Sequence, residues 1–219
     1  MIHSIKSHTR YFIAFALIIC VLGFCLFTFS KTDIHLFINS IHYPIFDFFF
    51  KYFTYVGDGV TFVLLAIIAL FISKRFSLQV ILTGLLVGII SQFFKKVVYG
   101  PTPRPSSFFE KLDIQLYYIE GVDLHTAFSF PSGHTTAIFA MTASILLVQK
   151  NKKYDFLLLV IAILVGYSRM YLSQHFLIDV FAGSILGTLI AILVFNIMYS
   201  NKMKLKTNLD QPLINFNTK

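Results

Sequence analysis

Apolar residues recur in long runs along almost the whole chain, and short polar stretches separate these runs. A helix needs about 20 predominantly apolar residues to cross the hydrocarbon core of a bilayer. Six runs approach or reach this length and predict six membrane-spanning helices: Tyr11–Phe29, Phe53–Ser73, Phe76–Val98, His134–Gln149, Phe156–Tyr171 and Phe176–Tyr199. We therefore expect an all-α fold, a six-helix transmembrane bundle that forms one domain over residues 1–219.

The second run is the weakest of the six, because its strictly apolar part extends only over Val60–Ile72. The stretch before it, Phe46–Tyr55, is rich in aromatic residues, which gather where a membrane meets water. We expect this stretch to lie at the interface before the chain enters the membrane.

Basic residues are distributed unequally between the two ends of these spans. Six spans place both termini on one side, together with the loops around Lys74 and Lys152, and this side holds most of the 18 Lys and Arg residues. Because cytoplasmic loops carry an excess of basic residues, we predict that residues 1–10 and the basic tail 200–219 are cytoplasmic. The tail is expected to fray or to lie on anionic lipid. The loop over residues 99–130 then faces the outside.

The composition agrees with an integral membrane protein and argues against other classes. Charged residues make up 13% of the chain, about half their usual share in a soluble domain. The net charge of +8 follows from the topology and gives no reason to expect nucleic acid. Cys20 and Cys25 lie together in the first run, so no disulfide is predicted. No His/Cys spacing resembles a zinc site.

Three polar clusters fall at the predicted outer ends of the spans, where charges near the membrane interior often mark function. The first is "KKVVYGPTPRP", from Lys95 to Pro105. Its prolines end the helix and hold Arg104 in a stiff extended segment. By itself this pattern also suits basic side chains that reach from a helix end toward lipid headgroups.

The second cluster is "PSGH", in which Pro131 and Ser132 are typical of a helix start. Gly133 lets another group approach the backbone closely, and His134 lies in the first turn. The free N–H groups and partial positive charge of a helix N-terminus suit a phosphate. A plain capped helix with an interfacial histidine is the alternative.

The third cluster, within Tyr167–Val180, contains Arg169, His175 and Asp179. The last two are four residues apart and share a helix face, so the carboxylate can fix the tautomer of the imidazole. A polar pair that fills the bundle interior is the alternative. Taken together, the three clusters supply cations, two imidazoles and a helix N-terminus on one surface, a set that suits a phosphoryl group.

At these residues the chain resembles the type 2 phosphatidic acid phosphatases, whose signatures are Lys-x6-Arg-Pro, Pro-Ser-Gly-His and Ser-Arg-x5-His-x3-Asp. The second and third signatures are complete here. The first departs, because seven residues separate Lys96 from Arg104 and Val97 stands where the spacing requires lysine. We expect Lys96 to take the role, with Lys95 or no lysine at all as the alternatives.

The resemblance implies a metal-independent mechanism with no cofactor. In it His175 attacks phosphorus and forms a phosphohistidine, Asp179 orients and stabilises that imidazole, and His134 protonates the leaving oxygen and then activates water. The phosphate oxygens would be held by Arg104, Arg169 and Lys96, by the Ser132 hydroxyl and by the N–H of Gly133.

For the remaining polar residues the sequence supports less specific predictions. Asp58 is expected to form a turn or cap, His125 to be a solvated loop residue, and His42 to lie at the interface. The outer loop could fold over the site as a lid, with acids that exclude some anionic headgroups: Glu110, Asp113, Glu120 and Asp123.

The expected partners are membrane lipids, among them a lipid phosphate substrate at the outer face of a bacterial inner membrane. Undecaprenyl diphosphate is favoured, with phosphatidylglycerophosphate, phosphatidic acid and lipid A phosphates as alternatives that the motifs do not separate. A six-span transporter or a non-enzymatic binder of anionic lipids is the rival class. It fits less well, because the polar groups gather at one surface and do not follow a path across the membrane. No oligomeric state follows from the sequence.

Overall fold

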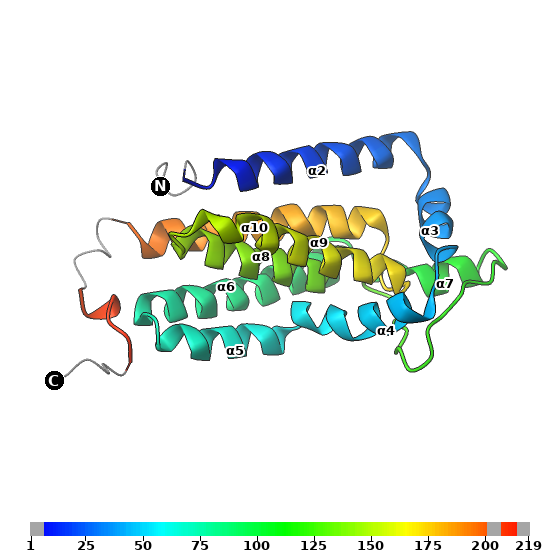
Figure 1. Cartoon of the computed structure of the whole chain (residues 1–219). Helices are drawn as coiled ribbons and strands as arrows, with labels where there is room; N and C mark the ends of the chain where they lie inside the picture. Colours follow the sequence, from blue (N-terminus) through cyan, green and yellow to red (C-terminus); the bar gives the residue numbers. More distant parts are fainter. Residues whose placement is uncertain (1–6, 201–206, 214–219) are drawn as a thin grey trace.

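The computed structural model describes residues 7–200 and 207–213. In this part of the chain every regular element is a helix, and the long ones run side by side along one direction (Figure 1). The α-helices are α2 (Thr9–Thr28), α3 (Lys31–Asn39), α4 (Pro44–Phe53), α5 (Gly59–Leu70), α6 (Lys74–Phe93), α7 (Pro105–Glu110), α8 (Gly133–Val148), α9 (Asp155–Tyr171) and α10 (Leu177–Met198). Four short helical turns complete the list: η1 (Thr54–Gly57), η2 (Phe94–Val98), η3 (Lys152–Tyr154) and η4 (Thr207–Leu209).

The helices agree closely with the expected apolar runs, and the all-α expectation is confirmed for the described residues. Four segments are long and apolar enough to cross a membrane: Thr9–Thr28, Lys74–Val98, Lys152–Tyr171 and Leu177–Met198. A fifth crossing is possible if α4–η1 and α5, which bend by 58° at Asp58, act as one span. Helix α8 is apolar but has only 16 residues. The six-span topology stays a prediction.

Helices α8 and α10 pack in close contact at the centre of the bundle. A Cβ atom on Gly187 would lie 2.2 Å from the carbonyl oxygen of Thr136, and one on Gly183 would lie 2.9 Å from that of Ser132. Only glycine allows this approach, because any larger side chain would meet backbone. The contact fixes the start of α8 against the first turns of α10.

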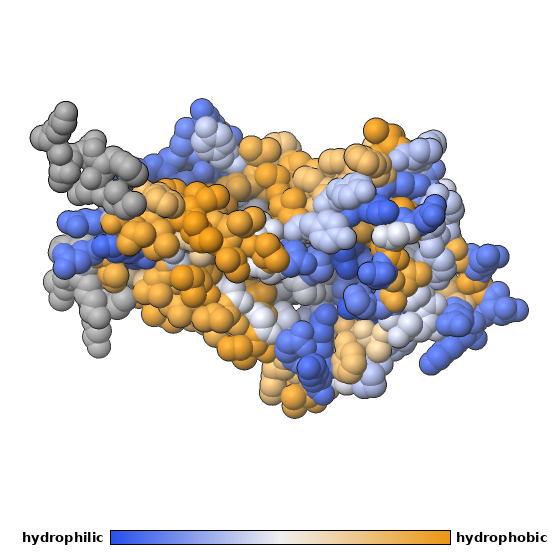
Figure 2. Space-filling model, turned by 90° about the horizontal axis from the view of Figure 1, so that it is seen from below, coloured by the Kyte–Doolittle hydropathy of each residue, from blue (hydrophilic) through white to orange (hydrophobic). Residues whose placement is uncertain are grey.

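Helix α2 lies at the edge of the bundle (Figure 1). Tyr11 is its one buried residue, and its start is tied to α9 because Nδ1 of His8 lies 2.9 Å from both carboxylate oxygens of Asp155. Figure 2 shows hydrophobic residues over much of one face, with hydrophilic residues gathered toward the end that carries α3 and α7. Exposed apolar side chains of this kind are expected where lipid surrounds a protein.

The described part of the tail packs back onto the bundle. Arg75 donates to both carboxylate oxygens of Asp210, at 2.5 and 3.1 Å, and the backbone N–H of Leu213 donates to Leu70. Residues 207–213 therefore pack on the protein and do not fray, whereas the expected contact of the tail with anionic lipid stays a prediction. The rest of the tail and residues 1–6 lie outside the described residues.

A hydrogen-bonded cluster ties the outer loop to α4 and to the end of α9. Asp47 accepts from the hydroxyl groups of Tyr171 at 2.6 Å and Tyr117 at 3.0 Å, and it contacts Nδ1 of His42 at 2.9 Å. The His42 ring also packs against both tyrosine rings. His42 is therefore enclosed by this cluster, and its place at the membrane interface stays a prediction.

Candidate active site

The three sequence motifs meet at one end of the bundle. Helix α9 ends at Tyr171, the chain turns within residues 172–176, and α10 begins at Leu177 beside the start of α8. The backbone N–H of Ser132 donates to the carbonyl oxygen of Asp179 at 3.1 Å, which joins the second and third motifs directly.

His175 and Asp179 form the pair that their spacing predicted. Nδ1 of His175 lies 3.3 Å from Oδ2 of Asp179, and both side chains are almost fully buried. The same oxygen accepts from the backbone N–H of Phe176 at 2.9 Å. The N–H of His175 donates to the carbonyl oxygen of Arg169 at 3.0 Å, so the loop closes over the end of α9.

Ser129 is a third member of this pair that the motifs did not identify. Its hydroxyl donates to Oδ2 of Asp179 at 2.5 Å and lies 3.4 Å from Nδ1 of His175. Its backbone N–H donates to the carbonyl oxygen of Thr102 at 3.2 Å and to the hydroxyl of the same residue at 3.1 Å. Ser129 therefore links the first motif segment to the carboxylate of the third.

The surroundings of His175 favour its neutral form. Burial lowers the pKa of His175 well below its ordinary value of 6.5, and the positive charges of Arg104, Arg169 and Lys95 act in the same direction. Its described hydrogen bonds use Nδ1. An imidazole that is neutral and held through Nδ1 can present Nε2 as a nucleophile.

Arg104 is held from three directions. Its Nε donates to the carbonyl oxygen of Ala127 at 2.9 Å, and its Nη1 donates to the backbone and side-chain oxygens of Gln174 at 3.2 and 3.3 Å. Gln174 in turn donates to the carbonyl oxygen of Asp123 in the outer loop at 2.9 Å. Burial lowers the pKa of Arg104, but an arginine remains charged near neutral pH.

Arg169 lies deeper, at the end of α9. Its Nη1 donates to the hydroxyl of Thr54 in η1 at 2.6 Å. Its Nε is buried and has no partner among the described residues. An unpaired buried donor is costly, so this guanidinium offers a hydrogen bond that an anion could complete.

The structure differs from the expectation at the lysine of the first motif. Lys95 is buried, whereas Lys96 is exposed. The Nζ of Lys95 lies 3.9 Å from the position that a Cβ on Gly133 would take. Lys95, and not the expected Lys96, is therefore the lysine whose side chain lies beside the second motif.

The cause of this difference is a π-helical turn at the end of the third span. The N–H of Tyr99 donates to the carbonyl oxygen of Phe94 at 2.9 Å, five residues back. Such a turn holds one residue more than an α-helical turn and is frequent at functional sites. It shifts the direction of the side chains of η2, so that simple counting from Arg104 does not locate the inward-facing lysine.

Ser132 has the capping role that the sequence predicted. It is fully buried, and its hydroxyl oxygen accepts from the hydroxyl of Thr135 at 2.8 Å and from the N–H of the same residue at 3.4 Å. His134, in the first turn of α8, is less enclosed: 29% of its side chain is exposed. Its Nε2 lies 3.8 Å from Oδ2 of Asp58.

Asp58 therefore does more than the expected cap. It caps α5 by accepting from the N–H of Val60 at 3.1 Å, and it faces His134 across a pocket of about 210 Å³. Arg169 and Thr54 also line this pocket, together with Gln174. His175 is next in the chain to Gln174.

The outer loop lines one side of the same pocket through residues 121–123 and His125. Lys51 of α4 holds this part of the loop, because its Nζ donates to the carbonyl oxygen of Glu120 at 2.6 Å. Gly121 has a φ of +72°, and a Cβ there would lie 2.7 Å from the Lys51 Nζ. The loop therefore forms part of the pocket wall, and its role as a lid stays a prediction. His125 is exposed but takes part in the pocket, so it is more than a solvated loop residue.

Several pocket residues have no signature in the sequence. Lys51 and Thr54 reach the site because α4 and η1 bend over it, and Ser129 and Gln174 reach it through loop geometry. The one signal that marked the last two is their closeness to a motif residue in the sequence, since Gln174 directly precedes His175 and Ser129 lies two residues before Pro131. Within the described residues no three His, Cys, Asp or Glu side chains are grouped as metal ligands would be.

Comparisons with known proteins give the same family as the motifs. A family model described as the PAP2 superfamily matches residues 74–203. Phosphatidylglycerophosphatase B of Bacillus subtilis is 41% identical over 78 residues, which cover 32% of this chain. An undecaprenyl-diphosphatase of Sulfolobus acidocaldarius is 38% identical over 80 residues, which cover 36%. Each alignment spans only 38% of the relative's own length.

A solved structure extends the similarity over most of the fold. The crystal structure of LpxE from Aquifex aeolicus is 26% identical in sequence and superposes with a TM-score of 0.67. The match covers 77% of this chain and 97% of LpxE. The arrangement of the helices around the motifs is therefore shared with that protein.

Proposed function

Because the chain belongs to the PAP2 superfamily, we propose that it hydrolyses a lipid phosphate or diphosphate through a phosphohistidine intermediate. The family confirms the resemblance that the motifs indicated. The observation that carries the mechanism is the meeting of His175, Asp179, Arg104, Arg169 and Lys95 at one end of the bundle.

In the proposed reaction Nε2 of His175 attacks phosphorus, and the P–O bond to the leaving group breaks. Asp179 stabilises the positive imidazole that forms, because it stays hydrogen-bonded to Nδ1. His134 gives a proton to the departing oxygen. It then takes a proton from water, which attacks phosphorus, breaks the P–N bond and releases inorganic phosphate.

The positively charged side chains would stabilise the negative charge of the phosphoryl group. Arg104, Arg169 and Lys95 would contact its nonbridging oxygens, with the Ser132 hydroxyl and the Gly133 N–H in supporting positions. Lys95 replaces Lys96 in this proposal because of its burial. The resemblance implies no metal or other cofactor for this chemistry.

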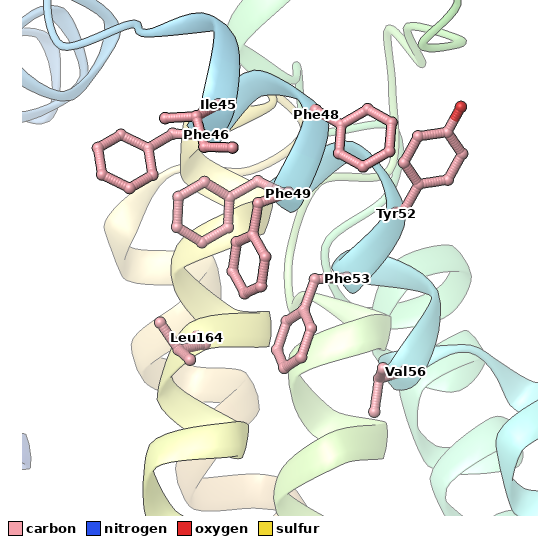
Figure 3. A pocket seen from close by; sticks show the side chains of 9 residues that line it. Ile45, Phe46, Phe48, Phe49, Tyr52, Phe53, Val56 and Leu164 are labelled. Atoms are coloured by element: carbon pink, nitrogen blue, oxygen red, sulfur yellow. The ribbon is translucent and has the colours of Figure 1, made fainter.

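An apolar groove beside the site supports a lipid as the substrate. It has a volume of about 760 Å³ and lies between α4 and Leu164 of α9. Figure 3 shows the rings of Phe49 and Phe53 pointing into it. The other face of the same bent segment carries Lys51 and Thr54, which line the polar pocket. A hydrocarbon chain in the groove would therefore place its phosphate near the cations.

The favoured substrate is undecaprenyl diphosphate, with phosphatidylglycerophosphate, phosphatidic acid and lipid A phosphates as alternatives. One relative is named an undecaprenyl-diphosphatase and another a phosphatidylglycerophosphatase, which supports testing all of these lipids. The site would face the outside of a bacterial inner membrane, with both termini in the cytoplasm. This orientation rests on the excess of basic residues on the opposite side.

The test is phosphate release from these lipids in detergent by wild-type protein and by His175→Ala. We expect His175→Ala to lower the rate by at least ~10³-fold, because it removes the nucleophile. His35→Gln is the matched control, since His35 is about as buried as His175 but contacts Ser173, at a variable position of the third motif. Both proteins should elute from a sizing column as the wild type does.

Retained turnover in folded His175→Ala would contradict the nucleophile assignment. Activity that disappears with a chelator and returns with magnesium would contradict the metal-independent mechanism. No turnover of any lipid in the panel by wild-type protein would contradict the proposed function itself.

A further inference from the structure

A second pocket lies at the opposite end of the bundle from the candidate active site. It has a volume of about 610 Å³ and lies between the beginning of α2 and the segment that joins η3 to α9. The candidate site is at the other end of α9, which has 17 residues and is therefore about 25 Å long. The two pockets thus belong to opposite membrane surfaces.

The mouth of this pocket is positively charged. Arg10, Lys152 and Lys153 line it, and all three are exposed. Asp155 is the one acid in its lining. This carboxylate contacts Nδ1 of His8 at 2.9 Å and accepts from the side chain of Gln149 at 3.0 Å. Three cations therefore line the pocket against one carboxylate, and a ligand that enters meets a net positive charge.

The N-termini of two helices add to the positive potential at the mouth of the pocket. Helices α2 and α9 both begin at the pocket, and neither has a side-chain hydrogen bond at its N-cap. The first turn of a helix carries a partial positive charge and N–H groups that suit phosphate oxygens. The charged side chains and the two helix ends therefore favour the same kind of ligand.

The deeper wall of the pocket is apolar. It is formed by Tyr11 and Ala14 of α2 and by Phe156 and Leu159 of α9. Phe156 is 73% exposed at the surface of an apolar helix, where hydrocarbon would surround it. A free phosphate ion would use only the mouth of such a pocket, whereas an amphiphile would use all of it.

We propose that this pocket binds an anionic phospholipid, with its phosphate between Arg10, Lys152 and Lys153 and an acyl chain along Phe156 and Leu159. The position of α2 gives the lipid a structural role. Only 6% of the most apolar window of α2 is buried within the protein, so few side chains hold this helix. A lipid that contacts both α2 and α9 adds a connection at the end where His8 meets Asp155.

The experiment measures lipid binding by native mass spectrometry in a neutral detergent, with phosphatidylglycerol and phosphatidylcholine added separately. We expect one retained phosphatidylglycerol and weaker retention of phosphatidylcholine. A basic residue near an anionic headgroup contributes about fivefold to binding, so Lys152→Gln/Lys153→Gln should weaken the phosphatidylglycerol adduct by roughly 25-fold.

The matched control is Lys74→Gln/Lys150→Gln, which removes the same charge from the same end of the bundle at residues that do not line the pocket. It should retain the adduct. Lys95→Gln, at the candidate active site, should retain it as well, which separates this pocket from substrate binding. Unchanged elution from a sizing column confirms that each variant is folded.

Three outcomes would overturn the proposal. One is an equal loss of phosphatidylglycerol in both double variants, which would indicate general attraction to a basic surface. Another is equal retention of phosphatidylcholine by the wild type. The third is displacement of the lipid by millimolar inorganic phosphate, which would indicate a free-anion site. None of these outcomes depends on lipid phosphatase activity.

Discussion

Helices α2 and α10 have nearly the same hydropathy and very different surroundings. The most apolar window of α2 has a mean hydropathy of 2.6 and is 6% buried, whereas that of α10 has 2.3 and is 56% buried. Apolar character therefore predicts that each helix enters the membrane, and it does not predict which one forms the interior.

Small side chains in α10 account for the difference in burial between the two helices. In α10, Gly183, Ser184, Gly187 and Thr188 fall on one face and are buried or nearly so against α8. Helices in lipid associate through such small residues, because no hydrophobic force drives apolar surfaces together there. In α2 the exposed positions are large, as with Phe24 and Phe27. The buried helix also carries Asp179, so packing and chemistry coincide.

The adjacent residues Lys95 and Lys96 allow the most sensitive test of whether burial determines the contribution of a residue to activity. Lys95→Gln should lower kcat/KM for the lipid phosphate by about 10²–10³-fold, the usual loss when one donor to a developing oxyanion is removed. Lys96→Gln should stay within about twofold, because its side chain is exposed. Steady-state phosphate release in detergent measures both. A larger loss for Lys96→Gln would return the role to the residue that motif counting favoured.

That pair also shows which site residues could be predicted from the sequence and which could not. The pairing of His175 with Asp179 was predicted from a four-residue step on one helix. The two side chains do meet, although His175 lies in the turn just before α10. Lys95 could not be found in this way, because the π-helical turn of η2 changes the step.

Loop residues were beyond prediction for a related reason. Ser129 and Gln174 reach the site through irregular backbone, whose direction no periodic pattern encodes. The bend of 58° that brings Thr54 to Arg169 is likewise a tertiary effect. Five of the expected spans, by contrast, agree with helices to within about two residues, since long apolar runs leave few alternatives. The second, expected over Phe53–Ser73, is divided by the bend before α5.

A smaller effect is expected where a buried residue acts through its neighbour. Ser129→Ala removes the hydroxyl that donates to Asp179 at 2.5 Å, so the His175–Asp179 pair loses one of its fixed contacts. Loss of alignment of a reacting group lowers kcat by up to ~10²-fold, and we expect kcat to fall while KM changes little. Ser184→Ala is the control, because the Ser184 hydroxyl donates within α10 to Phe181.

Rescue would identify the role of Ser129. Ser129→Thr retains the hydroxyl and should recover most of the rate, whereas a purely packing role would make the larger threonine worse than alanine. An equal fall of kcat in Ser129→Ala and Ser184→Ala would also contradict positioning, since the second serine has no contact with the pair.

The comparison between α2 and α10 is tested most directly by the same substitution in both helices. A Cβ on Gly187 would lie 2.2 Å from the carbonyl oxygen of Thr136, whereas one on Gly23 would lie 3.9 Å from the ring of Phe181. Gly187→Ala must push α8 and α10 apart, and overpacking of this kind costs about 1–3 kcal/mol. Gly23→Ala makes an ordinary contact and should be neutral or slightly stabilising, because alanine is the better helix former. Thermal unfolding in one detergent should therefore show a clear fall in Tm for the first variant and none for the second. Equal Tm values would mean that lipid or detergent, and not the contact with α8, determines the stability of α10.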